Sequence, residues 1–537
     1  MRFVTPPPPL ARWQPALFPP ALASCRARLS ERLLERIGPD GALRDPCRSR
    51  VLESALTLAL LDLIGHAHRF GAVRDRLVRY LRRQRHLSDA WDEAFTATVL
   101  GRHRGSAVHQ RMAEEFVART PAFTGWRKRL LAKSLFVMLG GPAPAVAAED
   151  LAGELLHPWA AVQVAAARTV LAHGAGRSDL VRDQDISLLL STQQPGQLGR
   201  VWEGNVLIHL MVLHALARLP GHEPAVARGV STVLRQQRDD GGIPFVTDTD
   251  TWCTVVAGLA LHTAGAPSQT LRPVAAHLMS LQRPDGGWSY TDRAKLADTD
   301  CTAVAVELLH RLDPVASRTA IGRALRYLLS VRGRDGGFPT YGAKTPSEPC
   351  MTAAAINALT TQAAAHERVI DGAVAFLASC QHSDGSFPAG WSGSRLHALF
   401  RAHLATRGLV GPAQAVNERI VGLVRRSQND DGGWGQQGGD GSDAISTAYG
   451  LIVAAGGFHD HRPAARAVRY LISQQGSDGG FDAPPDMLGP RPLPYHVPLL
   501  TDAFVLLAMG HLAQRTATAS RTVPGRRRPP MPVERTP

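Results

Sequence analysis

Two carboxylic acids stand two residues apart in the run DTDCTA, residues 298–303, which begins a helical segment near the middle of the chain. Burial raises the pKa of a carboxyl, and a second carboxylate close by raises it further because the two negative charges repel. Asp298 and Asp300 would therefore titrate as a coupled pair, one of which keeps its proton at neutral pH. We predict that Asp300 is a general acid and that Asp298 and Cys301 help to hold its proton. The alternative is that Asp300 is a solvated residue at a helix start.

A second run of the same kind, DTDTWCT, occupies residues 248–254. Here two residues separate Asp250 from Cys253, so the Asp-Cys-Thr register of the later run is lost. We predict that Asp250 caps a helix or lines a pocket and does not act as an acid.

The elements that must position these residues come from an internal repeat. A phrase of the form Gln-x-x-Asp-Gly-Gly, usually followed by an aromatic residue, recurs six times at intervals of 45 to 50 residues. The aspartates of the six copies are Asp240, Asp285, Asp335, Asp384, Asp431 and Asp478. Each Asp-Gly-Gly predicts a tight turn that follows one helix, and a Thr-Ala type of helix start comes after it.

Apolar residues recur at helical spacing after each turn, as in Ala303, Val306 and Leu309, and no alternating strand pattern of any length is present. The fold class is therefore all-α, with about two helices per repeat. Six helical hairpins favour a closed (α/α) barrel over an open solenoid, because the last copy has no polar capping face.

Four segments follow from this pattern. Residues 1–40 are expected to complete the repeat domain, and residues 41–230 form a diverged helical barrel in which the phrase survives only as PDGAL at its edge. Residues 231–515 form the barrel that contains the six copies. Residues 516–537 are rich in Arg and Pro and are predicted to be a disordered basic tail.

The repeats and the DTDCTA run together resemble a known family. The repeats look like the QW motifs of the terpene cyclases that include squalene-hopene cyclases, oxidosqualene cyclases and class II diterpene cyclases, and DTDCTA is similar to their Asp-x-Asp-Asp-Thr-Ala acid motif. Cys301 replaces the last Asp, but oxidosqualene cyclases carry Asp-Cys-Thr-Ala, so Asp300 matches the proton donor in both patterns. The resemblance implies two α-barrel domains, called β and γ, with the diverged first barrel as γ.

The resemblance also implies a protonation-initiated cyclisation. Asp300 would protonate an alkene, and aromatic faces would stabilise the carbocation that follows. The aromatic candidates are Trp202, Trp252, Trp288, Tyr290, Phe338, Tyr341, Phe387, Trp391, Trp434 and Tyr449. For each of them the alternative is packing between repeats.

The substrate class follows from chain length and from the absence of an apolar membrane-docking helix. The chain is similar to bacterial class II cyclases that convert farnesyl or geranylgeranyl diphosphate into a bicyclic drimane or labdane diphosphate. The resemblance also implies that cations bind the diphosphate and that Mg²⁺ binds with it. The candidates are Arg127 and Lys128, in a basic helical patch with Arg129 and Lys133, and Trp202 and Glu203 at the polar start of an apolar helix. These patches could equally be solvated surface.

Composition and charge narrow the class of protein further. The 537 residues carry a formal charge of +14, dispersed as Arg on helical faces, without a nucleic-acid motif. No apolar run approaches the ~20 residues that span a bilayer, and the amino terminus lacks a signal-peptide core, so we expect a cytoplasmic protein without stable membrane insertion. The oligomeric state is left open.

Three alternative functions stay open. One is a squalene or oxidosqualene cyclase, and another is a non-catalytic barrel that binds a prenyl chain or a peptide. The third is a zinc protein prenyltransferase, which the spacing of Asp298 and Cys301 disfavours.

Overall fold

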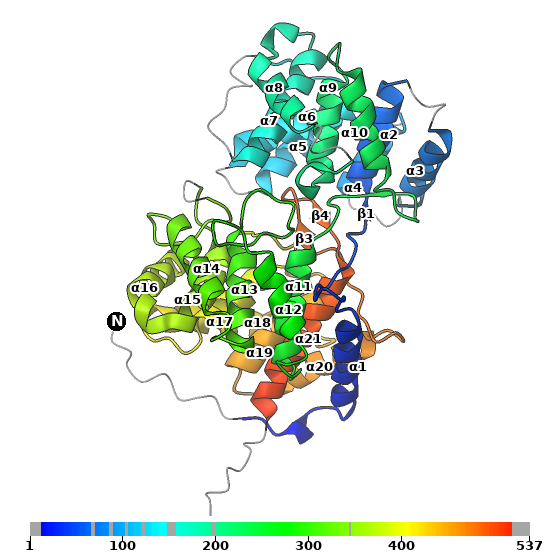
Figure 1. Cartoon of the computed structure of the whole chain (residues 1–537). Helices are drawn as coiled ribbons and strands as arrows, with labels where there is room; N and C mark the ends of the chain where they lie inside the picture. Colours follow the sequence, from blue (N-terminus) through cyan, green and yellow to red (C-terminus); the bar gives the residue numbers. More distant parts are fainter. Residues whose placement is uncertain are drawn as a thin grey trace, which may run out of the picture.

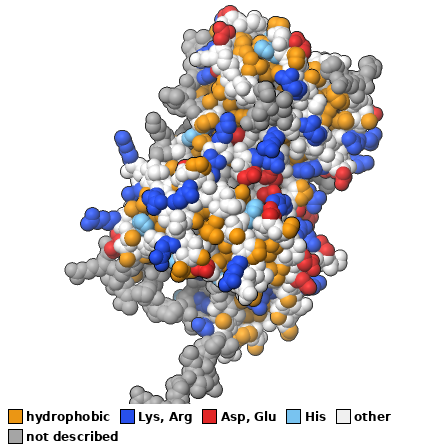
Figure 2. All heavy atoms as spheres, viewed as in Figure 1, with side chains coloured by type: hydrophobic (Ala, Val, Ile, Leu, Met, Phe, Trp, Pro, Cys, Tyr) orange, Lys and Arg blue, Asp and Glu red, His pale blue; other side chains and the backbone are white. Residues whose placement is uncertain are grey.

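The computed structural model describes residues 12–65, 70–84, 90–101, 106–120, 124–147, 157–194, 199–342 and 345–517. Its helices form two lobes that meet at a narrow waist, with β3 and β4 between them (Figure 1). The predicted basic tail lies outside the described residues from residue 518 onward. In the view of Figure 2, Lys and Arg side chains are scattered over both lobes, beside acidic ones at the waist. This distribution fits the dispersed Arg pattern of the sequence.

The lower lobe, which we call the large barrel, is a double ring of helices. Six inner helices contact one another in sequence, and α21 contacts α11 to close the ring. The inner helices are α11 (Asp250–Thr263), α13 (Thr299–Leu312), α15 (Pro349–Leu359), α17 (Leu396–Thr406), α19 (Ala444–Gly457) and α21 (Pro498–Thr516). The outer helices are α12 (Arg272–Ser280), α14 (Arg318–Val331), α16 (Ala363–Cys380), α18 (Pro412–Arg426), α20 (Arg462–Gln474) and α1 (Ala21–Glu35). The predicted all-α barrel architecture is confirmed.

The outer position between α20 and α11 is filled by α1, from the other end of the chain. This helix packs on α20, α21 and α11 and buries Cys25, Leu29 and Leu33. The amino-terminal segment thus supplies the sixth outer helix of the large barrel. A ring missing this helix would expose the apolar faces of its neighbours.

The upper lobe, which we call the small barrel, holds the helices between α1 and α11. Contacts link α2, α9, α7 and α6 in order, α4 contacts α2, and Phe95 of α4 packs on Phe136 of α6 with ring centroids 5.7 Å apart. The helices are α2 (Val51–Leu63), α3 (Gly71–Gln84), α4 (Ala90–Val99), α5 (Ser106–Ala118), α6 (Gly125–Met138), α7 (Pro158–Gly174), α8 (Asp183–Ser191), α9 (Val206–Leu216) and α10 (Glu223–Leu234).

Short elements join the barrels. Strand β1 (Ser49–Arg50) pairs antiparallel with β2 (Ile243–Pro244), where the chain enters and leaves the small barrel. Strands β3 (Met487–Leu488) and β4 (Pro494–Tyr495) form a hairpin of the large barrel. Arg50 donates a hydrogen bond to the Gly489 carbonyl of that hairpin and lies 4.3 Å from the Phe245 ring centroid. The four described 3₁₀ turns are η1 (Pro15–Leu17), η4 (Ser178–Leu180), η6 (Trp202–Gly204) and η7 (Thr360–Gln362).

In four copies of the large barrel the glutamine of the repeat phrase ties the turn to the next hairpin, whereas the Asp335 copy has Arg332 at this position. Its side-chain amide donates to a glycine carbonyl of its own turn and to a carbonyl at the start of the next outer helix, at 2.7–3.1 Å. The glutamines that do this in the large barrel are Gln282, Gln381, Gln428 and Gln475. The regular 45 to 50 residue period is therefore the period of hairpin-to-hairpin docking.

The structure corrects the assignment of one copy. Gln237, in the Asp240 copy, donates to the Val73 carbonyl of α3, so this copy belongs to the small barrel. The sixth turn of the large barrel is instead PDGAL at residues 39–43, where the Leu43 N–H donates to the Thr254 hydroxyl at 3.0 Å. The barrel boundary therefore lies near β2 and not at residue 230. The sequence pattern misled because the degenerate copy lost its glutamine and aromatic residue but kept its docking position.

Candidate active site

A cavity lies where the two barrels meet. Its wall combines α6, α7 and the η6–α9 segment of the small barrel with the starts of α11, α13 and α15 and the β3–β4 hairpin of the large barrel. Of the candidates named from the sequence, eleven line it: Arg127, Lys128, Trp202, Glu203, Trp252, Tyr290, Asp298, Asp300, Cys301, Tyr341 and Trp391. The structure thus brings together residues more than 260 positions apart in the chain.

Asp300 lies in the first turn of α13 and faces this cavity. Its Oδ1 accepts a hydrogen bond from Arg401 Nη2 at 2.8 Å, and the arginine side chain is only 4% exposed. Burial raises the pKa of Asp300, and the charge of Arg401 opposes that rise. A protonated Asp300 that keeps this hydrogen bond through one oxygen can present its proton to the cavity from the other. Once the proton has left, Arg401 stabilises the carboxylate.

Asp298 has a different role at the same helix end. It is the N-cap of α13, and its Oδ1 accepts from the Cys301 N–H at 2.7 Å. Burial raises the pKa of Asp298 to about 7, with a smaller contribution from the Asp300 charge. Burial and the two neighbouring carboxylates also raise the pKa of the Cys301 thiol well above its usual range. Both groups therefore lie beside Asp300 in forms that can carry a proton.

The repeat supplies an internal comparison for Asp300. In three repeats, a Thr hydroxyl four residues after the helix cap accepts a hydrogen bond from the backbone N–H of the residue that follows the turn. The pairs are Thr302 with Trp288, Thr352 with Phe338 and Thr447 with Trp434. The cap positions are thus Asp298, Glu348 and Asp443, all acidic. Two residues after the cap stand Asp300 in α13, Cys350 in α15 and Ile445 in α19. A carboxylate at the cap is a property of the repeat, whereas the one at Asp300 is particular to α13.

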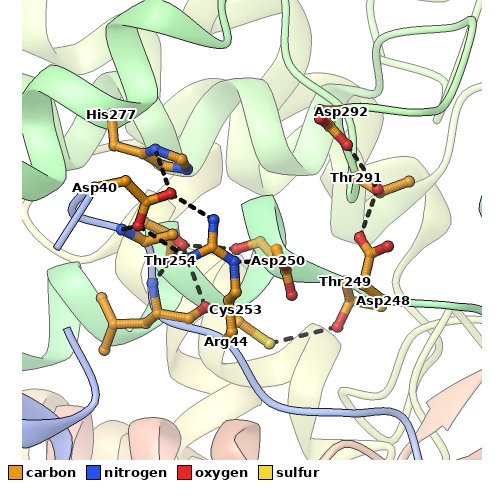
Figure 3. A network of polar contacts seen from close by, with 12 residues as sticks. Asp40, Arg44, Asp248, Thr249, Asp250, Cys253, Thr254, His277, Thr291 and Asp292 are labelled. Carbon is orange, nitrogen blue, oxygen red and sulfur yellow. Dashed lines mark hydrogen bonds and ion pairs between the residues drawn. The ribbon is translucent and has the colours of Figure 1, made fainter. Parts of the chain in front are cut away.

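The same comparison places Asp250. It stands four residues before Thr254, whose hydroxyl accepts from the Leu43 N–H, so Asp250 aligns with the cap positions of the other repeats. The N-cap of α11 itself is Thr249, and Asp250 is the first residue of the helix. Its Oδ2 lies 3.1 Å from Arg44 Nε, which also pairs with Asp40 (Figure 3). Burial and Asp248 raise the pKa of Asp250 to about 6, but the side chain is not part of the cavity wall. Trp252 takes the place that Asp300 has in α13, and it does line the cavity.

Aromatic side chains form much of the wall between the two ends of the cavity. Tyr341 and Trp391 meet edge to face with centroids 6.4 Å apart, and the Trp391 indole N–H donates to Thr340 at 2.9 Å. The candidates on the wall are Trp202, Trp252, Tyr290, Tyr341 and Trp391, and the sequence analysis missed Phe245 and Tyr495, which also line it.

Three predicted aromatic residues, Trp288, Phe338 and Trp434, are not on this wall. Each is at most 1% exposed and fills the core directly after a repeat turn. The Trp288 and Trp434 indoles donate to the carbonyls of Leu278 and Val424 in their own hairpins. Their assignment to substrate binding is therefore corrected to packing between repeats. Phe387 and Tyr449, named with them, also lie off the wall.

The small-barrel end of the cavity is cationic. Burial and Arg491 lower the pKa of Arg127 to about 10, and burial with both arginines lowers the pKa of Lys128 well below its usual range. Of the three cations, Arg491 pairs with Glu348, and Lys128 donates to the Arg491 carbonyl at 2.7 Å. Positive charge thus exceeds negative charge here, an arrangement that an anion would stabilise.

Glu203 lies on the same side with an unusual backbone. Its φ is 48°, the left-handed region that costs a residue other than glycine about 1–2 kcal/mol. Its Oε2 accepts from the Lys295 N–H at 3.2 Å, whereas Oε1 is buried with no hydrogen-bond partner among the described residues. Burial raises the pKa of this carboxyl. A buried carboxylate oxygen with free lone pairs fits one ligand position of a Mg²⁺ ion that takes its other ligands from phosphate and water.

Two further charged residues of the site, Arg401 and Arg491, carry no signal in the sequence. Arg401 lies 101 residues after Asp300 and Arg491 lies 143 residues after Glu348. Neither belongs to a motif, so only the tertiary structure pairs them with these carboxylates. Within the described ranges, no group of three or more His, Cys, Asp or Glu residues could hold a metal by itself. The searched helices include none that is long and apolar enough to cross a membrane.

Comparisons with known proteins show what the chain is similar to. Residues 203–346 and 325–484 match the Prenyltransferase alpha-alpha toroid domain family. A drimenyl diphosphate synthase from Streptantibioticus cattleyicolor is 39% identical over 93% of this chain and 96% of its own length. A second one, from Streptomyces showdoensis, is 38% identical over 91% of this chain and 95% of its own length. The structure of ent-copalyl diphosphate synthase from Streptomyces platensis has the same fold, with a TM-score of 0.52 and 17% identity over 92% of this chain and 100% of that one.

Proposed function

Since the chain belongs to the class II terpene cyclase family, we propose that its substrate is farnesyl diphosphate and that its product is drimenyl diphosphate. The choice of a C15 substrate rests on the two relatives of that name, which this chain matches over more than nine-tenths of its length. The observation that carries the chemistry is the position of Asp300. It is a carboxyl of the large barrel on the wall of an aromatic cavity, to which the small barrel contributes Arg127 and Lys128.

In this proposal the Asp300 carboxyl transfers its proton to the terminal alkene of the prenyl chain. A C–H bond forms, the O–H bond breaks, and two further alkenes attack in turn to close two rings. Loss of a proton from the final cation forms the new alkene, so one proton enters and one leaves. The diphosphate C–O bond stays intact. The aromatic faces of Trp252, Tyr290, Tyr341 and Trp391 stabilise the passing cation, which offers no lone pair to a hydrogen-bond donor.

The diphosphate would bind at the small-barrel end, against Arg127, Lys128 and Arg491. Among these cations an ion pair joins Arg491 to Glu348, and the aromatic and apolar residues of the same cavity wall fit the prenyl chain. Binding by the diphosphate also fixes which alkene reaches the acid, because the chain extends from one end of the cavity to the other.

We propose that Mg²⁺ binds with the substrate and that Glu203 is its protein ligand. The support is the unpartnered, buried Oε1 of Glu203 on the cavity wall. A bound Mg²⁺ would neutralise part of the diphosphate charge.

We also propose that the protein is cytoplasmic.

The test is to incubate the purified protein with farnesyl or geranylgeranyl diphosphate and Mg²⁺, remove the phosphates, and identify the alcohols by mass spectrometry. We expect drimenol from farnesyl diphosphate, and a higher kcat/KM for this substrate than for the C20 one. A preference for geranylgeranyl diphosphate would overturn the C15 assignment. Unchanged farnesol and geranylgeraniol would overturn the proposed activity, and a parallel incubation with squalene tests the triterpene alternative.

A further inference from the structure

A second, smaller void lies inside the ring of inner helices, further along α13 than Asp300. It has a volume of about 20 Å³ and is lined by residues of α11, α13, α17 and α21, among them Glu307 and Arg401. Glu307 follows Asp300 by seven residues, which is two helical turns and the same face of α13. Arg401 therefore has one acidic residue of α13 on each side, since it also donates to Asp300.

Polar atoms without partners meet at this void. Glu307 is 7% exposed, and its Oε1 is buried with no hydrogen-bond partner among the described residues. Arg401 Nε is likewise buried with no hydrogen-bond partner among the described residues. A volume of this size accommodates one water molecule, which could accept from the arginine and donate to the carboxylate.

Burial raises the pKa of Glu307, and the Asp300 charge adds to that rise. Three cations oppose it: Arg401, Arg311 of α13 and Arg407, which follows α17. His511 of α21 also lines the void, and burial with the nearby cations lowers its pKa well below the usual range, so it is neutral. The residues of α11 that line the void, Val256, Leu259 and Thr263, carry no charge. Asp300, in contrast, has Arg401 as its one favourable charge.

We propose that Glu307 is the counter-ion of Arg401 and that its negative charge keeps the proton on Asp300. This proposal rests on the proposed function. With Arg401 facing Asp300 alone, the pair would lose the proton that the reaction needs and become an ion pair. With Glu307 ionised on the other side, the arginine charge is already balanced, and Asp300 can stay neutral while it accepts the hydrogen bond.

After Asp300 has given its proton to the alkene, Arg401 lies between two carboxylates. Asp300, Arg401 and Glu307 together then carry one excess negative charge, which favours the return of a proton to Asp300. Glu307 would thus be a positioning residue: it touches no substrate and acts through Arg401.

Glu307→Gln tests the proposal because it removes the charge and keeps the shape. The measurement is kcat and KM for farnesyl diphosphate across the pH range. Removing the negative charge lowers the pKa of Asp300, so the pH at which activity is lost should fall by about one unit. At neutral pH kcat should drop about tenfold, KM should stay nearly constant, and activity should return on acidification. Glu307→Asp should restore most of the wild-type profile.

Glu418→Gln, the same change on the exposed face of α18, is the matched control and should leave the profile unchanged. A Glu307→Gln profile that superimposes on wild type, or an equal loss of kcat at every pH, would overturn the proposal. If the wild type turns over no prenyl diphosphate, the proposed function fails instead. The proposal is then decided by infrared titration of the carboxyl band that Asp300→Asn removes. That band should persist to a higher pH in wild type than in Glu307→Gln, and coincident titrations would refute it.

Discussion

At the scale of single residues, position in the repeat separates the acid from its neighbours. Asp298 is the N-cap of its helix and Asp250 aligns with it in the repeat, whereas Asp300 stands two residues further into its helix, on the cavity wall. Burial raises the pKa of Asp300, and in the proposed function Arg401 would stabilise the carboxylate that remains after proton transfer. Burial would thus retain the proton on Asp300, and Arg401 would supply its acid strength.

The first prediction concerns Asp300→Asn, which preserves shape and the oxygen that accepts from Arg401 but removes the acidic proton. We expect kcat for farnesyl diphosphate to fall by about 10³-fold or more, with KM nearly unchanged, because the cations and aromatic wall remain. Asp250→Asn, at the Arg44 pair outside the cavity, is the control and should keep most of the activity. A folded Asp300→Asn enzyme with near-normal turnover would refute the assignment.

The second prediction concerns the pH dependence of stability and Asp298. Its pKa is raised from 3.8 to about 7 in the folded state, so the folded state binds more protons than the unfolded state between these values. The free energy of unfolding therefore falls as pH rises through this window. Asp298→Asn retains a good N-cap and removes the titration, so the loss should shrink by on the order of 2–4 kcal/mol.

Chemical denaturation at the two ends of this pH window measures the change. Asp313→Asn, an exposed position at the end of the same helix, should retain the wild-type pH dependence. If Asp298→Asn loses as much stability as wild type between the two pH values, Asp298 is not the titrating group.

At the scale of elements, the Asp-Gly-Gly turns hold each helical hairpin against the next one. The Asp285 carboxylate accepts from the Gly287 N–H at 3.0 Å, Gln282 ties the turn to α14, and Gly286 lies against the backbone of that helix. Side-chain and backbone contacts therefore fix the position of each hairpin relative to the next. The same geometry sets the start of α13, because the Asp298 N–H donates to the Trp288 carbonyl that follows the turn.

The third prediction is Gly286→Ala. The residue has a φ of 93°, and an added Cβ would lie 2.6 Å from the Arg323 carbonyl oxygen, so both strain and a backbone clash result. We expect a loss of about 3 kcal/mol or more, seen as a fall in Tm. Gly265→Ala is the control, since its φ is 103° but nothing lies within 4 Å of the added atom, and it should cost only about 1–2 kcal/mol. Equal losses would show that docking at the turn contributes little.

At the scale of the whole molecule, the cavity needs both barrels. The large barrel contributes the acid and most of the aromatic wall, and the small barrel contributes Arg127, Lys128 and Glu203. The β3–β4 hairpin brings Arg491 to the same cationic end. In the proposed function, the small barrel would hold the diphosphate while the acid of the large barrel protonates the prenyl chain.

The fourth prediction tests this division with Arg127→Gln. The loss of one cavity cation should raise KM for farnesyl diphosphate by about tenfold or more and change kcat much less, because the acid end is untouched. Arg129→Gln on the exposed face of the same helix is the control and should behave as wild type. A fall in kcat alone, with KM unchanged, would contradict the assignment of Arg127 to diphosphate binding.

The sequence by itself determined the helical repeat and the barrel, and it singled out Asp300 as a candidate acid, because these depend on local patterns: turn residues, helical periodicity and the short DTDCTA run. It also named Arg127 and Lys128, which do line the cavity, together with Arg129, which is exposed. Only the tertiary structure decided which partners those residues meet. Arg401 reaches Asp300 from two hairpins away, PDGAL closes a ring whose other turns lie more than 200 residues later, and Trp288 and Trp434 pack inside while Trp252 faces the cavity. Such pairings depend on ring closure, which no window of sequence contains.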